Sequence, residues 1–216
     1  MTDDELKRLF DAIREVKGTG LTPRDVRLIN AALAGEEPVQ EIDRAAFFAK
    51  VRSAFGPLRQ AQVDGFNTLL DAMKAWPVTY TAYGLATAWH ETAHTMQPIA
   101  EYGKGKGRPY GKPGRNGGQI PYGRGYVQLT WDENYERADR ELGLNGALIA
   151  DYDKAMEPDI AAAIMVRGMQ EGWFTGKKLS NYLPGDYINA RRVINGTDRS
   201  ALIAGYARVF EKALTA

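Results

Sequence analysis

Cysteine is absent from this sequence of 216 residues. Disulfide bonds, thiolate metal sites and cysteine nucleophiles are therefore excluded. The lack of disulfides also favours synthesis in the cytoplasm, where thiols stay reduced. Histidine is scarce as well, so it can contribute to a site only through His90 and His94.

The sequence also lacks long hydrophobic runs. No stretch of about 18 apolar residues occurs, so we expect no transmembrane helix. The first residues are acidic and polar and no apolar segment follows them, so we expect no signal peptide of the ordinary kind. If the target of the protein lies outside the cytoplasm, another component has to release it.

Charge of one sign is lacking too, because the formal net charge is only +1. Bulk electrostatics therefore do not mark the chain as a binder of polyanions. Hydrophobic residues make up 44% and charged residues 25%, the usual composition of a globular protein. The length fits one domain with a sizeable core, or one domain with a small appendage.

Apolar residues recur at spacings of three and four along most of the chain, which predicts helices. Gly143 and Gly172 are expected to end two of them, and Thr197 or Asp198 to cap the last. The predicted helical segments are 3–17, 23–33, 41–55, 59–75, 81–95, 132–142, 157–171 and 198–214.

A connector at residues 35–40 contains Gly, Glu and Pro and indicates a domain boundary. We place it near residue 38, so that residues 1–38 form a helical hairpin appended to one domain over residues 39–216. No internal repeat period is visible. The pattern predicts a mainly α fold.

One long loop interrupts the helical pattern. Residues 102–125 contain nine glycines, and no acidic residue occurs between Glu101 and Asp132. Short strands are expected near residues 126–129, at the end of this loop. Long loops inside compact domains are usually functional. Six cations lie in it: Lys104, Lys106, Arg108, Lys112, Arg115 and Arg124.

The segment from His90 to His94 reads His-Glu-Thr-Ala-His, which matches the H-E-x-x-H pattern of zinc peptidases. On a helix both imidazoles would share one face, and Glu91 could activate a zinc-bound water. A third ligand is needed, however, and the sequence offers no convincing one. We therefore expect no metal, and we keep the zinc peptidase as a weaker alternative.

Glu91 and Glu101 form a second candidate pair. Glycoside hydrolysis usually needs one carboxylic acid to protonate the leaving oxygen and one carboxylate to activate water. The helix around Glu91 is rich in Ala, Leu and Trp, an apolar setting that suits the acid. Glu101 opens the cationic loop, where positive charge would keep it ionised. Two unrelated glutamates would look the same in the sequence.

Residues 122–131 read Tyr-Gly-Arg-Gly-Tyr-Val-Gln-Leu-Thr-Trp, and Asn134 and Tyr135 follow. Aromatic faces stack on sugar rings, while amides and hydroxyls bind sugar hydroxyl and acetamido groups. The segment therefore suits a sugar-binding site. It could also be a turn-rich core segment that buries Tyr126 and Trp131, and both interpretations can hold at once.

These motifs, together with Val193-Ile-Asn-Gly196, occur in an order that resembles glycoside hydrolase family 19, the plant-type chitinases and their phage endolysin relatives. The resemblance covers roughly residues 45–214. It is strongest to the endolysin branch, through residues 161–169 and 171–178. It implies a lysozyme-like, mainly α domain with a small β or loop lobe beside a substrate cleft.

The resemblance also implies roles for individual residues. Glu91 matches the general acid of the family, and Glu101 is the candidate for the second carboxylate. Thr130 lies where the family has a Ser or Thr that holds the attacking water. The family inverts the anomeric carbon, and no cofactor is implied. Four further residues match substrate-binding positions: Tyr122, Gln128, Asn134 and Asn195.

Three departures from the family pattern stand out. The spacing between Glu91 and Glu101 is shorter than in plant chitinases, so the assignment of Glu101 departs from the family pattern where that of Glu91 follows it. The cysteines of the plant enzymes are absent, as in the phage branch. His94 replaces a small or apolar residue, and we interpret it as a packing or cleft-wall residue.

The resemblance predicts an endolysin that cleaves β-1,4 bonds of peptidoglycan glycan strands as a muramidase. A chitinase acting on N-acetylglucosamine polymers and a catalytically inactive sugar-binding module are the alternatives. We expect a monomer made in the cytoplasm of a host bacterium that reaches the cell wall or periplasm through a holin-type pore. The cationic loop could bind nucleic acid, but an acidic wall polymer explains it at least as well, and we expect no nucleic-acid partner.

Overall fold

The computed structural model describes residue 11 and residues 42–216. The predicted helices over 3–17 and 23–33 and the boundary near residue 38 lie outside the described residues, apart from the helical residue Asp11. Residues 42–216 belong to one compact unit. This unit is mainly helical with a small β element, so the predicted fold class is confirmed.

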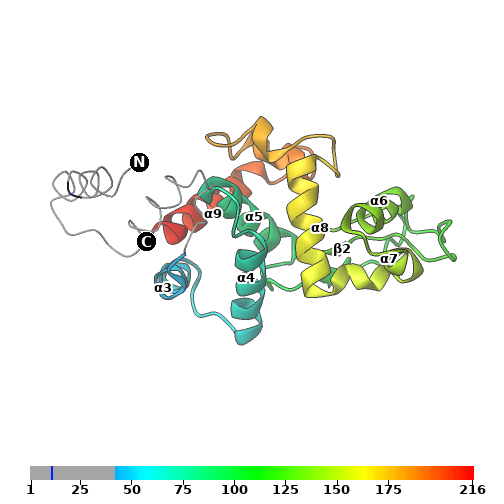
Figure 1. Cartoon of the computed structure of the whole chain (residues 1–216), viewed down its shortest axis with the longest axis horizontal. Helices are drawn as coiled ribbons and strands as arrows, with labels where there is room; N and C mark the ends of the chain where they lie inside the picture. The colour runs from blue at the N-terminus through cyan, green and yellow to red at the C-terminus, as the bar shows by residue number, and fades with distance from the viewer. Residues whose placement is uncertain (1–10, 12–41) are drawn as a thin grey trace. The chain divides into compact units, whose positions relative to one another are not determined.

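The elements of this unit are shown in Figure 1. Two short strands, β1 (Ile99–Ala100) and β2 (Arg124–Gly125), pair antiparallel with Ile99 opposite Gly125. Three 3₁₀ helices are η1 (Tyr152–Met156), η2 (Leu179–Asn181) and η3 (Asn189–Val193). The α-helices are α3 (Arg44–Phe55), α4 (Gln60–Ala72), α5 (Val78–Glu91), α6 (Asp132–Leu142), α7 (Ala147–Ala150), α8 (Pro158–Glu171) and α9 (Ser200–Leu214).

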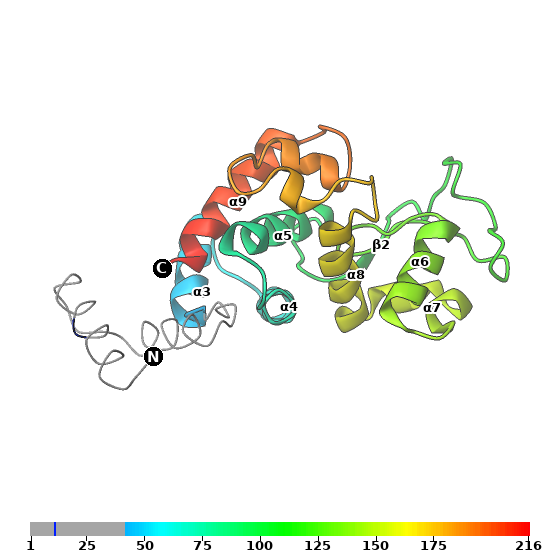
Figure 2. The same ribbon diagram turned by 45° about the horizontal axis from the view of Figure 1, so that its top comes forward.

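Helix α5 is the buried centre of the unit. Every residue from 81 to 89 is buried, as expected of a helix that is apolar around its whole circumference. Helix α9 packs along it, and Figures 1 and 2 show α6 and α7 on the far side of α8 from these two helices. Aromatic rings join α5 to its neighbours: Trp89 lies 5.0 Å from Phe55 and 5.9 Å from Phe66 between ring centroids.

The predicted helices over 41–55, 59–75, 132–142, 157–171 and 198–214 all form, with ends shifted by a few residues at most. Gly143 and Gly172 adopt the left-handed conformation at the ends of α6 and α8, as expected. The predicted N-cap of α9 was wrong. The N-cap is Arg199 in a left-handed conformation, and neither Thr197 nor Asp198.

Helix α5 ends at Glu91, four residues before the predicted end at residue 95. The hydroxyl of Thr92 donates to the carbonyl of Ala88 at 2.7 Å and accepts from the backbone N–H of Met96 at 3.0 Å. Ala93 and His94 then take positive φ angles of 49° and 66°, which no α-helix accommodates. The side-chain bonds of Thr92 therefore turn the chain just after Glu91.

The prediction of a strand at residues 126–129 was also wrong. The strand β2 lies at Arg124–Gly125, and Leu129 only forms an isolated bridge with Arg124. The long loop from Glu101 to Gly123 connects β1 to β2 in a series of turns. Among the described residues, no helix has the length and apolar character needed to cross a lipid bilayer.

Candidate active site

A cleft of about 300 Å³ opens beside the C-terminal end of α5. Its walls come from five separate parts of the chain. Glu91 is the only acidic residue among the lining residues. The lining residues are Glu91, Tyr110, Val127, Gln128, Thr130, Trp131, Asn134, Phe174, Ile194 and Asn195.

Glu91 is held by a buried arginine. Nη1 of Arg191 lies 2.5 Å from Oε1 of Glu91, and the side chains of the two residues are 4% and 16% exposed. Nε of Arg191 donates to the carbonyl of Asp198 at 3.1 Å, which fixes the guanidinium. Oε2 of Glu91 has no partner among the described residues, so one carboxylate oxygen remains available to a ligand.

The two histidines do not form the face that a zinc site requires. Because α5 ends at Glu91, His94 does not continue the helix that carries His90. The His94 ring stacks on Trp89 with 4.7 Å between centroids, and its Nε2 lies 3.3 Å from the hydroxyl of Tyr206. Burial lowers the pKa of both histidines. Among the described residues no three acidic or histidine side chains are grouped to hold a metal ion.

The floor of the cleft contains two strained residues. Gln128 and Trp131 have φ angles of 55° and 77°, in the region that side chains larger than glycine rarely adopt. Such strain is often found where a side chain is aimed at a ligand. Trp131 is 45% exposed, and its ring meets that of Tyr110 edge-on at 5.3 Å. The sequence reading in which Trp131 is a core residue is therefore wrong, whereas Tyr126 is buried.

Hydrogen bonds within this floor leave acceptors for a ligand. The amide nitrogen of Gln128 donates to the carbonyls of Ile99 at 3.1 Å and Gly125 at 3.2 Å. The Thr130 hydroxyl donates to the carbonyl of Gln128 at 2.7 Å, and the Asn134 amide donates to the carbonyl of Thr130 at 2.7 Å. The donors of Gln128 and Thr130 are all used on the backbone, and Asn134 keeps one amide hydrogen, so the three side-chain oxygens are left to accept from a ligand.

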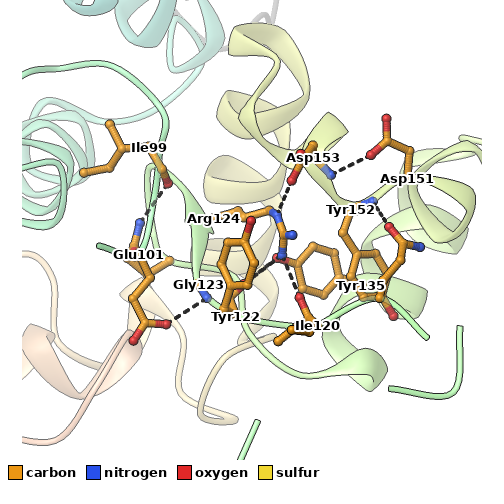
Figure 3. Close-up of polar contacts among 12 residues, drawn as sticks. Ile99, Glu101, Ile120, Tyr122, Gly123, Arg124, Tyr135, Asp151, Tyr152 and Asp153 are labelled. Atoms are coloured by element: carbon orange, nitrogen blue, oxygen red, sulfur yellow. Dashed lines mark hydrogen bonds and ion pairs between the residues drawn. The ribbon is translucent and has the colours of Figure 1, made fainter. Parts of the chain in front are cut away.

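Glu101 does not line the cleft, but it contacts a residue that does. Its carboxylate accepts from the hydroxyl of Tyr110 at 3.2 Å and from the backbone N–H of Gly123 at 3.3 Å. Burial and the negative charge of Glu101 raise the pKa of Tyr110. Figure 3 shows Glu101 beside Gly123, next to the segment that carries Tyr122 and Arg124. Tyr110 therefore stands between Glu101 and the cleft.

Tyr122 is buried and is not among the residues that line the cleft. Its ring faces the guanidinium of Arg124, whose central carbon is 3.5 Å from the ring centroid, and its carbonyl accepts from the Tyr135 hydroxyl at 2.7 Å. Arg124 is 5% exposed and forms an ion pair with Asp153 at 2.8 Å. Figure 3 shows this guanidinium between Tyr122 and Tyr135. In the structure Tyr122 therefore packs against Arg124 and helps to hold β2 in position.

The structure brings Glu91, Gln128, Thr130, Asn134 and Asn195 to one cleft. Sequence reasoning missed Arg191, Tyr110 and Phe174. No local signal marks Arg191, because its partner Glu91 is 100 positions away. Tyr110 and Phe174 lie in loops, where periodicity gives no information on which way a side chain points.

No family model matches the chain. Several solved structures share its fold. Chitinase C from Streptomyces griseus HUT6037 superposes with a TM-score of 0.58 at 22% identity, over 81% of this chain and 76% of its own. The family GH19, class IV chitinase from Zea mays gives 0.51 at 20% identity, over 80% and 92%. A bacterial family 19 chitinase gives 0.51 at 21%, over 80% and 94%.

The described unit therefore has the fold of the family 19 chitinases. A curated relative, endochitinase A from Zea mays, is 32% identical over 79 residues, which are 37% of this chain. The chain spans about a quarter of the length of that relative, because the match covers 26% of it.

Proposed function

We propose that this chain hydrolyses β-1,4-glycosidic bonds of bacterial peptidoglycan and acts as an endolysin of the muramidase type. The observation that carries the proposal is the cleft in which the carboxylate of Glu91 faces the polar side chains of Gln128, Thr130, Asn134 and Asn195. The aromatic rings of Trp131 and Tyr110 complete it, as in many sugar sites. The shared fold and the motifs of residues 90–92 and 122–131 support it.

Glu91 is assigned the role of the general acid. Of the residues that the structure describes, it contributes the only carboxyl group to the cleft wall, and its Oε2 is not occupied by Arg191. This oxygen can carry the proton that passes to the glycosidic oxygen as the bond to the anomeric carbon breaks. Arg191 acts as a positioning residue, because its bond to Oε1 fixes the rotamer of the carboxyl group.

Thr130 and Glu101 are assigned to the attacking water. The only proton of the Thr130 hydroxyl is bonded to the carbonyl of Gln128, so toward the cleft this oxygen accepts. A water that donates to Thr130 would turn a lone pair toward the anomeric carbon. The hydroxyl of Tyr110 donates to Glu101, so the oxygen of Tyr110 would accept the proton released by the water while its own proton passes to Glu101.

The amides are assigned to the N-acetylated sugar. The side-chain oxygens of Asn134 and Gln128 can accept from an acetamido N–H. The side-chain oxygen of Asn195 accepts from the N–H of Gly196 at 2.8 Å, and its amide nitrogen can donate to a ligand. This combination of acceptors and donor matches an acetamido group, which offers one N–H and one carbonyl. The exposed face of Trp131 provides a surface for a sugar ring.

Chitin is the second candidate substrate. The solved structures that share the fold are described as chitinases, and the N-acetylglucosamine of chitin carries the same acetamido group. The muramic acid of peptidoglycan differs from it by a lactyl ether. Release through a holin-type pore, action as a monomer and a role in host lysis remain predictions that rest on the sequence resemblance.

The deciding experiment compares purified peptidoglycan with chitin oligomers as substrates. Products are reduced with borohydride and identified by mass spectrometry. Reduced muramic acid ends from the wild type, and none from Glu91→Gln, would support the muramidase. Products from chitin alone would replace it by the chitinase, and binding without any product would favour an inactive sugar-binding module. Cleaved peptide bonds would contradict a glycosidase altogether.

A further inference from the structure

The cations of the long loop fall into two groups in the structure. Arg124 is buried with Asp153, and Arg115 binds Glu133 at 2.8 Å and Glu136 at 2.6 Å. The other four side chains are exposed and form no ion pair with any described residue. We call them the basic loop: Lys104, Lys106, Arg108 and Lys112.

The backbone of the basic loop is closed on itself by two glycines. A Cβ atom on Gly111 would lie 1.8 Å from the carbonyl oxygen of Gly105, and one on Gly105 would lie 2.7 Å from Cα of Gly111. The N–H of Lys106 donates to Gly103, and that of Arg108 donates to Gly105 at 2.9 Å. The close approach of Gly105 and Gly111 holds the ends of the 105–111 segment together. Lys104 and Lys112 are next to these ends in the sequence and Lys106 and Arg108 lie between them, so the four cations belong to one closed turn. Like charges repel one another, and such a group gains stability when an anion binds.

The basic loop adjoins the cleft. Tyr110 lies between Arg108 and Lys112 in sequence and lines the cleft, while Glu101, the acidic residue at the start of the loop, is occupied by Tyr110 and Gly123. Tyr102, at 85% exposure, lies near the start of the same loop. A polymer that fills the cleft would therefore pass an unneutralised cationic surface.

We propose that the basic loop binds the carboxylates of the peptide stems carried by the glycan strand in the cleft. This inference rests on the proposed function, which puts a peptidoglycan strand in that cleft. Stem peptides carry several carboxylates for each disaccharide, whereas chitin carries none, so the charge complementarity lies with peptidoglycan. The loop thereby selects the acidic wall polymer over a neutral glycan with the same sugar backbone.

The test compares two charge-matched triple variants. In the loop variant, Lys104→Gln, Lys106→Gln and Lys112→Gln are combined. In the control variant, three other exposed lysines that do not line the cleft are changed in the same way: Lys50→Gln, Lys74→Gln and Lys212→Gln. Both variants lose three positive charges, so any effect of overall charge is the same in the two.

Binding is measured by co-sedimentation with intact peptidoglycan, with Glu91→Gln added to every protein so that hydrolysis does not interfere. The loop variant should bind about 3- to 100-fold more weakly than the control variant, because each of the three exposed ion contacts contributes a factor of roughly 1.5 to 5. Added salt should weaken the control variant more than the loop variant, since screening removes the same contacts. Peptidoglycan whose carboxylates have been converted to amides should bind both variants equally.

Equal sedimentation of the two variants would overturn the inference. A second outcome would also overturn it: the loop variant loses binding to a single-stranded oligonucleotide but sediments with peptidoglycan as well as the control variant does. The loop would then bind nucleic acid. Failure of the proposed function has a different signature: the chain with Glu91 intact would release no sugar products from either form of peptidoglycan. Hydrolysis with equal binding would leave the proposed function standing and remove only the loop assignment.

Discussion

At the scale of single residues, the chemistry of the cleft depends on the carboxyl group of Glu91, of which one oxygen is bound by a protein side chain and the other is open to a ligand. Arg191 occupies Oε1, and among the described residues no other acidic side chain lines the cleft. Thr130 and Asn134 are held by bonds to the backbone, so their oxygens are fixed before a ligand arrives. Preorganised groups of this kind are expected where catalysis depends on orientation.

Replacing Glu91 by Gln should abolish proton donation while leaving the fold intact. A glutamine keeps the shape and can still accept from Arg191, but it leaves this buried guanidinium without its counter-charge, so the melting temperature should fall although the fold is kept. The rate of glycan hydrolysis should fall by a factor of about 10²–10⁴, the usual contribution of general acid catalysis. Release of reducing ends measures the rate, and circular dichroism checks the fold. Wild-type turnover in the variant would exclude Glu91 as the acid.

Arg191 should contribute to both stability and rate. Arg191→Met leaves the carboxylate of Glu91 without its buried partner, which should cost about 3 kcal/mol in the free energy of unfolding. Adding Glu91→Gln to this variant should restore part of the loss, because the uncompensated charge is removed. Denaturant titrations of the four proteins give the coupling energy. Additive losses would show that the two side chains do not interact in solution.

At the scale of elements, the apolar periodicity was sufficient to predict five of the helices within a few residues. It failed where a local side-chain bond overrides the pattern. Thr92 ends α5 at Glu91 although apolar spacing continues, and Arg199 caps α9 from a left-handed conformation that its residue type does not favour. The position of β2 depends on its partner β1, which lies more than twenty residues earlier in the chain.

The contact of α4 with the turn after α5 should tolerate no added methyl group. A Cβ on Gly65 would lie 1.7 Å from the carbonyl oxygen of Met96, in the turn that follows Glu91. Gly65→Ala should therefore lower the free energy of unfolding by about 3 kcal/mol or more. Gly205→Ala in α9 is the matched control, since nothing lies within 4 Å of its Cβ, and it should stabilise by about 0.5–1 kcal/mol. Thermal unfolding of both variants decides, and equal effects would contradict the close contact.

The link between the long loop and α6 should depend on pH. Hydrogen bonds from Arg115 and then from Asn116 lower the pKa of Glu136 from 4.5 to about 2. A carboxylate whose pKa is lowered by folding adds stability above its unfolded value, and this stability is lost as the pH falls through the folded value. Arg115→Gln should therefore melt about 1–3 °C below wild type at neutral pH, because the pair is on the surface. The difference should vanish as the pH approaches about 2, and a constant difference would contradict the pairing.

At the scale of the whole molecule, the candidate site is assembled from segments that periodicity cannot relate to one another. Glu91, Tyr110, Phe174 and Asn195 each come from a different part of the chain and meet only in the folded unit. Ordered motifs led to five of the cleft residues. The Glu91–Arg191 ion pair and the exposure of Trp131 depend on tertiary packing, which short-range sequence patterns do not contain.

All the candidate residues lie within residues 42–216, which share one buried core. This arrangement predicts that a chain beginning at residue 42 folds by itself and keeps its activity on short soluble oligosaccharides, because the described core and the residues that line the cleft all belong to this part of the chain. The melting temperature should stay within about 5 °C of the full chain, the size of shift that roughly 1 kcal/mol produces. Calorimetry and the reducing-end assay on both chains provide the comparison. A shortened chain that is unfolded, or that has lost activity on soluble substrates, would show that the domain needs its N-terminal residues, whereas a loss confined to intact cell walls would assign those residues to the wall.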